Sequence, residues 1–132
     1  MNRVGAAGHP GGVSTARRRT AWHVGEGAAW EAYRRRGYRL VARNWRCPLG
    51  EIDLVLSRDD VVVVCEVKTR TSAAMGPPHE AVNPAKQRKV RTVAEAFLAA
   101  RGLRESRCRL DVASVRLLDD GRAEVRVFED AF

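Results

Sequence analysis

Two acidic residues and a lysine, Asp53, Glu66 and Lys68, have the types and the spacing that catalysis of hydrolysis requires. Asp53 lies within one apolar stretch, and Glu66-Val67-Lys68 ends the next. Carboxylate oxygens bind Mg²⁺ or Mn²⁺, and such an ion lowers the pKa of a bound water and neutralises charge on a phosphate. A neighbouring lysine can orient the attacking water or stabilise the oxygens of the transition state. Together these groups could hydrolyse a phosphodiester bond.

A β-hairpin would bring the two acids together. Stretches 50–58 and 61–68 are rich in aliphatic and β-branched residues, and the acidic pair Asp59-Asp60 separates them. With this pair as a two-residue loop, Asp53 lies directly opposite Glu66. Opposed like charges destabilise a sheet, and a divalent cation is the simplest compensation. We therefore expect Asp53 and Glu66 to be the metal ligands, with a main-chain carbonyl from the second strand completing the coordination.

The same register predicts two faces for the hairpin, because side chains alternate along a strand. The apolar face comprises Ile52, Leu54, Leu56, Val63, Cys65 and Val67. The charged face comprises Glu51, Asp53, Glu66 and Lys68, with Val55 and Val64 further along. Three alternatives stay open. The charged face could be the solvent side of a half-exposed sheet. Lys68 could be the counter-charge of Glu51 opposite it. Finally, Asp-Asp lacks the glycine that favours a tight turn, so a longer loop or a bulge would shift every partner.

The composition is that of one globular domain with a basic excess. The chain has 132 residues, of which 45% are hydrophobic and 30% charged, and its net charge is +8, which favours polyanionic partners. No apolar run approaches the roughly 18 to 20 residues that span a bilayer, and no secretory signal is recognisable, so we expect no membrane association. The cysteines at 47, 65 and 108 are widely spaced, which indicates reduced thiols and a cytoplasmic location.

The N-terminal residues differ in composition from the rest. Residues 1–20 contain four arginines, several glycines and no acid, so we expect a disordered basic tail followed by a single domain over 21–132. The tail could be an arm for nucleic acid or incidental. A helix is predicted from about Trp22 to Arg36, with Gly37 ending it. Glu26 in its first turn suits the helix dipole; alternatively, it is a third carboxylate at the rim of the metal site.

The remaining stretches predict four further elements around the hairpin. Residues 38–44 and 108–118 alternate as strands, 123–128 forms the last strand, and Asn83-Pro84 begins a helix that ends at Gly102. The order α-β-β-β-α-β-β predicts an α/β protein with a mixed sheet flanked by two helices. A loop containing Met75, Gly76, Pro77 and Pro78 borders the charged end of the hairpin, so it could close over a ligand.

The second helix carries a basic cluster in its first half. The cluster comprises Lys86, Arg88, Lys89 and Arg91, and Arg70 follows the hairpin. A solvated face is the default interpretation of such a cluster. The functional interpretation is that these residues contact phosphates, which positions a nucleic acid without reading its sequence.

Several motifs resemble a known family. An acidic helix followed by Asp and then Glu-x-Lys on the next strand is similar to the PD-(D/E)XK nuclease superfamily, which includes restriction endonucleases. The YraN-like family of small endonuclease-like bacterial proteins is a closer resemblance. It is carried by Gly25-Glu26, Gly37-Tyr38, Ala42-Arg43-Asn44-Trp45-Arg46, Gly50-Glu51-Ile52-Asp53-Leu54, Glu66-Val67-Lys68-Thr69-Arg70, Glu80-Ala81-Val82, Arg109-Leu110-Asp111-Val112 and Ala131-Phe132. One departure is Ala32-Tyr33, where the pattern has an aromatic residue followed by leucine.

The resemblance implies a restriction endonuclease-like αβββαβ core with Glu26, Asp53, Glu66 and Lys68 at the active-site positions. The leading hypothesis is a metal-dependent nuclease that acts on DNA, in preference to RNA, with branched or damaged structures as candidate substrates. Paired cuts in a duplex usually need two active sites, so a homodimer is compatible with this function. Two alternatives stay open: a non-catalytic nucleic-acid-binding or scaffold module on a nuclease fold, and a structural protein whose charged face docks an acidic partner.

Overall fold

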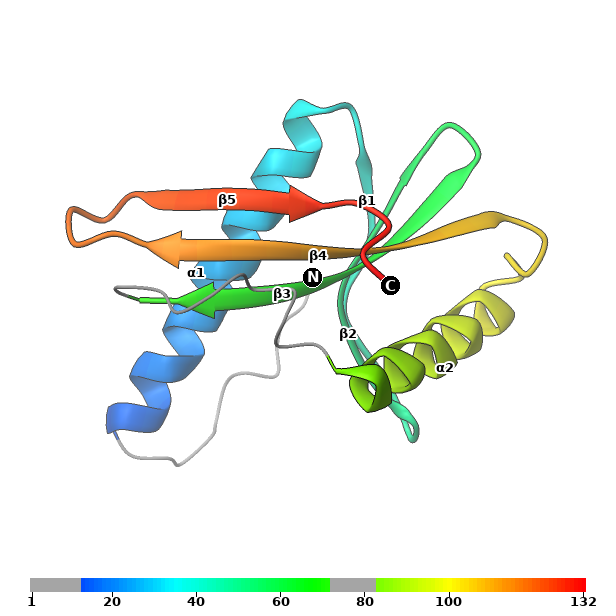
Figure 1. Ribbon diagram of the computed structural model, residues 1–132, viewed down its shortest axis with the longest axis horizontal. Coiled ribbons are helices and arrows are strands. Elements are labelled where there is room, and N and C mark those ends of the chain that lie inside the picture. The colour runs from blue at the N-terminus through cyan, green and yellow to red at the C-terminus, as the bar shows by residue number, and fades with distance from the viewer. Residues whose placement is uncertain (1–12, 72–82) are drawn as a thin grey trace.

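The computed structural model describes residues 13–71 and 83–132. Two helices and five strands follow one another in the predicted order (Figure 1). They are α1 (Val13–Arg35), β1 (Arg39–Cys47), β2 (Gly50–Arg58), β3 (Val61–Arg70), α2 (Pro84–Ala100), β4 (Arg107–Leu117) and β5 (Ala123–Phe128). The α/β class and the αβββαβ core are therefore confirmed.

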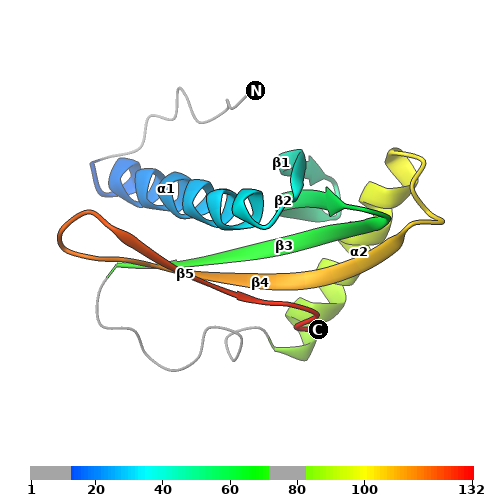
Figure 2. The same ribbon diagram turned by 90° about the horizontal axis from the view of Figure 1, so that it is seen from above.

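The five strands form one mixed sheet in the order β1-β2-β3-β4-β5. Neighbouring strands are antiparallel except β3 and β4, which run parallel because α2 connects them. Seen from above, α1 lies along one face of the sheet and the N-terminal part of α2 lies beyond the other (Figure 2). The sheet is thus covered on both sides, as predicted for a sheet flanked by two helices.

Each helix packs on its own hydrophobic cluster. The cluster under α1 comprises Ala29, Tyr33, Tyr38, Leu54, Leu56, Val63, Cys65, Ala113 and Val115. The cluster under α2 comprises Ile52, Val55, Val62, Val64, Val90, Val93, Ala94, Phe97, Leu98 and Leu110. The apolar residues of α2 recur at helical spacing. Helix α2 begins at the predicted cap, where Asn83 Oδ1 accepts a hydrogen bond from the main-chain N–H of Lys86 at 2.9 Å.

The register predicted for the β2–β3 hairpin is confirmed along its paired length. Pairing runs from Arg58 opposite Val61 to Leu54 opposite Cys65, with Asp59 and Asp60 as the two-residue loop. Asp59 has φ of 55°, which an aspartate tolerates and which such a tight loop requires. The recorded pairing ends at Leu54 and Cys65, so Asp53 and Glu66 lie just beyond it rather than within the ladder.

The predicted faces of the hairpin need one correction. Ile52 was expected beside Leu54 on the apolar face, but it packs in the α2 cluster, on the side opposite Leu54. Val55 and Val64 of the supposed charged face are also fully buried under α2. Strict alternation holds only while a strand is regularly paired. Here the β2–β3 pairing ends before Asp53, so the alternation does not carry through to Ile52.

Helix α1 is longer than the sequence indicated. It begins at Val13 instead of about Trp22, so residues 13–20 of the expected disordered tail are helical. The stretch contains three arginines and one alanine, residue types that favour helix. Residues 1–12 and the predicted loop around Met75 to Pro78 lie outside the described residues. Among the described helices, none has the length and apolarity needed to cross a membrane.

Candidate active site

Asp53 lies at the point where β2 and β3 stop pairing. Its carboxylate bridges the strands there, because Asp53 Oδ2 accepts a hydrogen bond from the main-chain N–H of Val67 at 2.8 Å. Burial raises the pKa of Asp53 to about 8, the nearby Glu66 carboxylate adds to the increase, and the hydrogen bond from Val67 opposes it. Asp53 is thus an acid whose charged form lacks sufficient compensation within the protein.

Glu66 projects from β3 toward the start of α2 and is only 7% exposed. Its nearest cation is Lys86, whose Nζ lies 3.8 Å from Glu66 Oε1. Burial raises the pKa of Glu66, while Lys86 and, to a smaller extent, Lys68 oppose the increase. The structure therefore brings Lys68 into the electrostatic environment of Glu66, as the sequence predicted, and adds Lys86 as a closer partner.

Glu26 comes from α1 and is 8% exposed. The amide Nδ2 of Asn44 donates to both of its carboxylate oxygens, at 3.1 and 3.2 Å. Burial raises the pKa of Glu26, and Asn44 and Arg43 lower it. Glu26 also acts electrostatically on both Asp53 and Glu66, so the three predicted acids form one group. We call Glu26, Asp53 and Glu66 the acidic cluster.

A close helix–strand approach positions Glu26. A Cβ built on the preceding residue, Gly25, would lie 2.0 Å from Thr69 Oγ1 on β3. Only glycine allows α1 to approach β3 this closely at its present position. Gly25 and Thr69 thus set the depth at which the helix presents Glu26 to the other two acids.

The expected pairing of Glu51 with Lys68 is wrong. Glu51 pairs in register with Arg46 of β1, and the Arg46 Nε–Glu51 Oε1 distance is 3.7 Å. The β2–β3 pairing does not extend to Lys68, which stands opposite Ser114 of β4 instead. Lys68 is therefore not held as the counter-charge of Glu51 in the structure.

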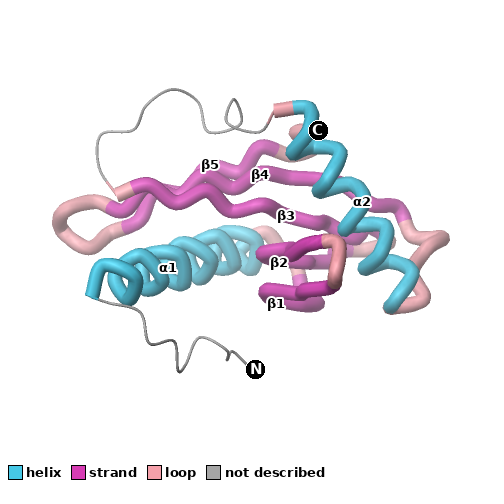
Figure 3. Tube along the Cα trace, turned by 90° about the horizontal axis from the view of Figure 1, so that it is seen from below, coloured by secondary structure: helices cyan, strands magenta, loops and turns pink. Residues whose placement is uncertain are grey.

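The predicted nucleic-acid-binding residues do not share one surface. Lys86 lies one turn before the buried Val90 and faces the sheet, where it meets Glu66. Lys89 is exposed, and its Cε would lie 3.4 Å from a Cβ on Gly50, the first residue of β2. Figure 3 shows α2 passing beside the β1–β2 turn that precedes it. Arg88 and Arg91 are exposed on the far side of α2. Arg70 is the last residue of β3, opposite Arg116.

The carboxylates match the ligand chemistry of Mg²⁺ or Mn²⁺, although they do not form a complete cage. Within residues 13–71 and 83–132, no group of three or more His, Cys, Asp or Glu side chains has the geometry of a ready-made metal site. Mg²⁺ is commonly held by one or two carboxylates together with waters and substrate phosphates. Asp53 and Glu66, whose charged forms repel each other in a buried setting, fit such an open site.

Sequence reasoning missed Arg43 and Asn44 as neighbours of the acidic cluster. Asn44 has φ of 50°, inside a strand, and this conformation accompanies the contact between its amide and Glu26. An asparagine between strand-forming residues is unfavourable for a strand, and that is the signal that could have identified it.

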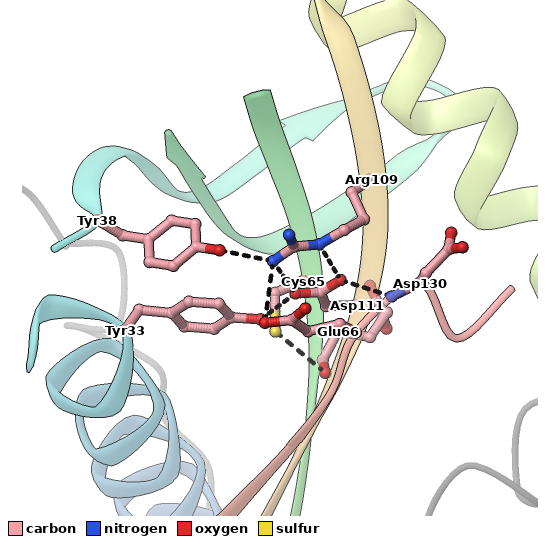
Figure 4. A network of polar contacts seen from close by, with 8 residues as sticks. Tyr33, Tyr38, Cys65, Glu66, Arg109, Asp111 and Asp130 are labelled. Atoms are coloured by element: carbon pink, nitrogen blue, oxygen red, sulfur yellow. Dashed lines mark hydrogen bonds and ion pairs between the residues drawn. The ribbon is translucent and has the colours of Figure 1, made fainter. Parts of the chain in front are cut away.

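A second buried polar network anchors α1 and the C-terminus (Figure 4). It extends to the main chain of the acidic cluster, because Cys65 Sγ donates to the Glu66 carbonyl oxygen at 3.6 Å. Asp111 is fully buried and accepts hydrogen bonds from Tyr33 Oη at 2.7 Å, from Arg109 Nε at 3.0 Å and from the Asp130 main-chain N–H at 3.0 Å. Arg109 also donates to Tyr38 Oη at 2.8 Å. Tyr33, the departure from the family pattern, thus supplies a hydrogen bond as well as packing, and the satisfied network indicates a structural role.

Comparisons with known proteins identify relatives over most of the chain. The family model described as Uncharacterised protein family UPF0102 matches residues 25–115. A UPF0102 protein of Moorella thermoacetica is 42% identical over 119 residues, which cover 89% of this chain and 99% of the relative. A UPF0102 protein of Symbiobacterium thermophilum is 43% identical, covering 86% of this chain and 97% of the relative. A UPF0102 protein of Pelobacter propionicus is 37% identical and covers 100% and 97%.

Proposed function

The chain belongs to the UPF0102 family, the YraN-like family that its motifs predicted, and from this premise we propose that it is a metal-dependent nuclease. The proposed reaction is hydrolysis of phosphodiester bonds in DNA, with branched or damaged structures as candidate substrates. The observation that supports it most strongly is the acidic cluster, in which three elements contribute carboxylates of raised pKa. Perturbed acids next to cations are typical of catalytic sites.

Each residue has a definite part in this proposal. Asp53 and Glu66 would hold Mg²⁺ or Mn²⁺, with Glu26 at the rim and the Val67 carbonyl as a further oxygen. When bound, the ion lowers the pKa of a coordinated water and neutralises charge on the phosphate. Lys68 would orient the attacking water or stabilise the transition-state oxygens. Lys86 holds Glu66 in place through the ion pair at 3.8 Å.

The partners follow from charge and composition. The net charge of +8 and the basic residues of α2 favour a polyanion, and Arg70 extends this charge along β3. We propose a cytoplasmic location, because the cysteines at 47, 65 and 108 are all free thiols in the structure. A homodimer would supply the two active sites that paired cuts need.

The experiment that tests this function compares wild type with Asp53→Asn. Mn²⁺ and Mg²⁺ binding is measured by calorimetry, and both proteins are then incubated with linear, nicked, flap and four-way junction DNAs. Wild type should bind the ion and produce metal-dependent cleavage, and Asp53→Asn should lose both, because one of two carboxylate ligands is gone. Asp120→Asn makes the same chemical change in a surface turn and should behave as wild type. Equal cleavage by Asp53→Asn would assign the activity to a contaminant.

A non-catalytic nucleic-acid-binding module is the second candidate. The finding that favours it is the absence, within the described ranges, of a ready-made group of three or more metal-binding side chains. This candidate predicts salt-sensitive DNA binding with no metal-dependent product and no difference between wild type and Asp53→Asn in calorimetry with Mn²⁺.

A further inference from the structure

The Nε–H group of Arg43 is a buried hydrogen-bond donor, and the described part of the chain provides no acceptor for it. Arg43 Nε is enclosed and has no hydrogen-bond partner, although 29% of the side chain remains exposed. A buried donor without an acceptor costs free energy, because its hydration is lost without replacement. Such groups are rare in native proteins, and this one shows that the Arg43 guanidinium is incompletely paired. Because Nε is enclosed, a ligand would meet Arg43 through the exposed part of the side chain.

The carboxylate nearest to Arg43 is already occupied. Arg43 Nη2 lies 3.9 Å from Glu26 Oε1, whereas a charge-assisted hydrogen bond measures about 2.7–2.9 Å. Asn44 instead donates to both oxygens of Glu26, and it does so from the left-handed region at φ of 50°. Asn44 therefore holds Glu26 more closely than Arg43 does, and Arg43 forms no bidentate pair with this carboxylate.

The position of Arg43 relates this donor to the acidic cluster. Arg43 stands opposite Leu54 on β2, the residue next to Asp53, and its guanidinium approaches Glu26 of α1. Lys86 approaches the same cluster from α2, through Glu66. The acidic cluster therefore has a cation next to Glu26, which is Arg43, and another next to Glu66, which is Lys86. An anion that neutralises Arg43 would lie beside the acids without displacing Lys86.

We propose that Arg43 binds a non-bridging phosphate oxygen of the nucleic acid, with Asn44 as the positioning residue that keeps its guanidinium available. This assignment rests on the proposed function, since it names a substrate contact of the same site. Phosphate fits because the planar guanidinium presents paired donors to tetrahedral oxyanions. A phosphodiester would also bring the bond to be cleaved to the acidic cluster.

The first test measures binding of a fluorescent oligonucleotide duplex by anisotropy, with Ca²⁺ in place of Mg²⁺ so that cleavage does not interfere. Arg43→Gln should bind the duplex at least about tenfold more weakly, which is the loss expected for a hydrogen bond to a charged group. The slope of log affinity against log salt concentration should also fall by about one. The control Arg39→Gln removes the same charge from the exposed start of β1 and should have a small effect. Asn44→Ala should also weaken binding, because Glu26 becomes available to Arg43.

The second test uses duplexes that carry one neutral methylphosphonate at successive positions. At one position the substitution should weaken binding by wild type, and the same substitution should cause no further loss in Arg43→Gln. This non-additivity identifies the phosphate that Arg43 contacts. Circular dichroism and thermal melting check that each variant folds. If Arg43→Gln does not fold, Arg43→Lys keeps the stem and charge, and it should lose part of the discrimination at that position.

The outcomes separate this inference from the proposed function. Binding by Arg43→Gln equal to wild type, a loss no greater than in Arg39→Gln, or unchanged methylphosphonate discrimination in Arg43→Lys overturns the role of Arg43 alone. If wild type binds neither the duplex nor Mn²⁺, the nuclease proposal falls together with it.

Discussion

The Asp53 carboxyl bears two penalties in its charged form, burial and the neighbouring Glu66, and together they raise its pKa to about 8. Glu26 and Glu66 have raised pKa values for the same main reason. The folded protein without metal therefore holds protons that the unfolded chain would release near pH 4. A divalent cation can replace those protons, because it compensates the same negative charge.

The stability of the metal-free protein should consequently fall as pH rises from about 4 to about 8. In this window the folded state binds more protons than the unfolded state, so raising the pH favours unfolding. Asp53→Asn should reduce the decrease by on the order of a few kcal/mol, since the amide does not titrate. Urea unfolding in EDTA at a series of pH values measures the effect.

Two controls accompany this series. Asp120→Asn in a surface turn should reproduce the wild-type profile, and saturating Mn²⁺ should flatten the profile of wild type above neutral pH, because the metal binds the ionised acids. A metal-free wild type that becomes more stable between pH 5 and 8, relative to Asp53→Asn, would contradict the raised pKa.

Among the secondary-structure elements, α1 has the tightest constraint. Gly25 lies against Thr69 of β3 so closely that a Cβ would meet its Oγ1 at 2.0 Å and its Cβ at 3.1 Å. Gly27 lies two residues further along the same helix, and a Cβ built on it would have no atom within 4 Å. The two glycines share a helix and differ in their surroundings, so they form a matched pair.

Gly25→Ala should destabilise the protein by roughly 1–3 kcal/mol, because the added methyl forces α1 away from β3. Gly27→Ala should stabilise it by about 0.5–1 kcal/mol, since alanine favours the helix. Chemical denaturation measures both. Thr69→Ala removes Oγ1 and Cγ2 and should partly restore the stability of Gly25→Ala.

Moving α1 away from β3 would also move Glu26. Gly25→Ala should therefore weaken Mn²⁺ binding as well, whereas Gly27→Ala should leave Mn²⁺ binding unchanged. Equal stabilities for the two alanine variants would show that α1 does not approach β3 as closely as described.

At the scale of the whole molecule, the two helices cover opposite faces of the sheet, and each brings one side chain to the candidate site. Helix α1 contributes Glu26 and α2 contributes Lys86, while β2 and β3 contribute Asp53 and Glu66. The outward side of α2 remains as an exposed basic surface, comprising Arg88 and Arg91. Lys86, which pairs with Glu66, is thus separate from Arg88 and Arg91, which are exposed and able to attract a polyanion at longer range.

If the exposed side of α2 contacts DNA, the double variant Arg88→Gln/Arg91→Gln should lower the log–log salt dependence of binding by about two. Each neutralised phosphate releases a counterion, so losing two contacts reduces the slope accordingly. The control Arg104→Gln/Arg122→Gln removes two exposed arginines elsewhere and should leave the slope nearly unchanged. Equal slopes for both double variants would mean that α2 contributes only general charge.

The sequence by itself determined the elements and their order. Periodicity, the Asn83-Pro84 helix start and the Asp59-Asp60 loop are local signals, and each element they predicted is present, with β5 at its predicted bounds. The hairpin register also followed from local information, because a two-residue loop leaves only one alignment of its strands. The start of α1 was wrong by nine residues, since an arginine-rich stretch resembles a tail as much as a helix.

Only the tertiary structure decided which groups meet at the acidic cluster. Lys86 was predicted as one of four surface cations, yet it pairs with Glu66. The sequence marks Asn44 as an unusual strand residue, but only the fold shows that its left-handed backbone brings its amide to Glu26. Alternation placed Ile52 on the wrong face because it presumes uninterrupted pairing, whereas the pairing of β2 with β3 ends at Leu54 and only that with β1 continues. Contacts between residues far apart in sequence depend on how strands diverge and helices cross, and local patterns carry no information about either.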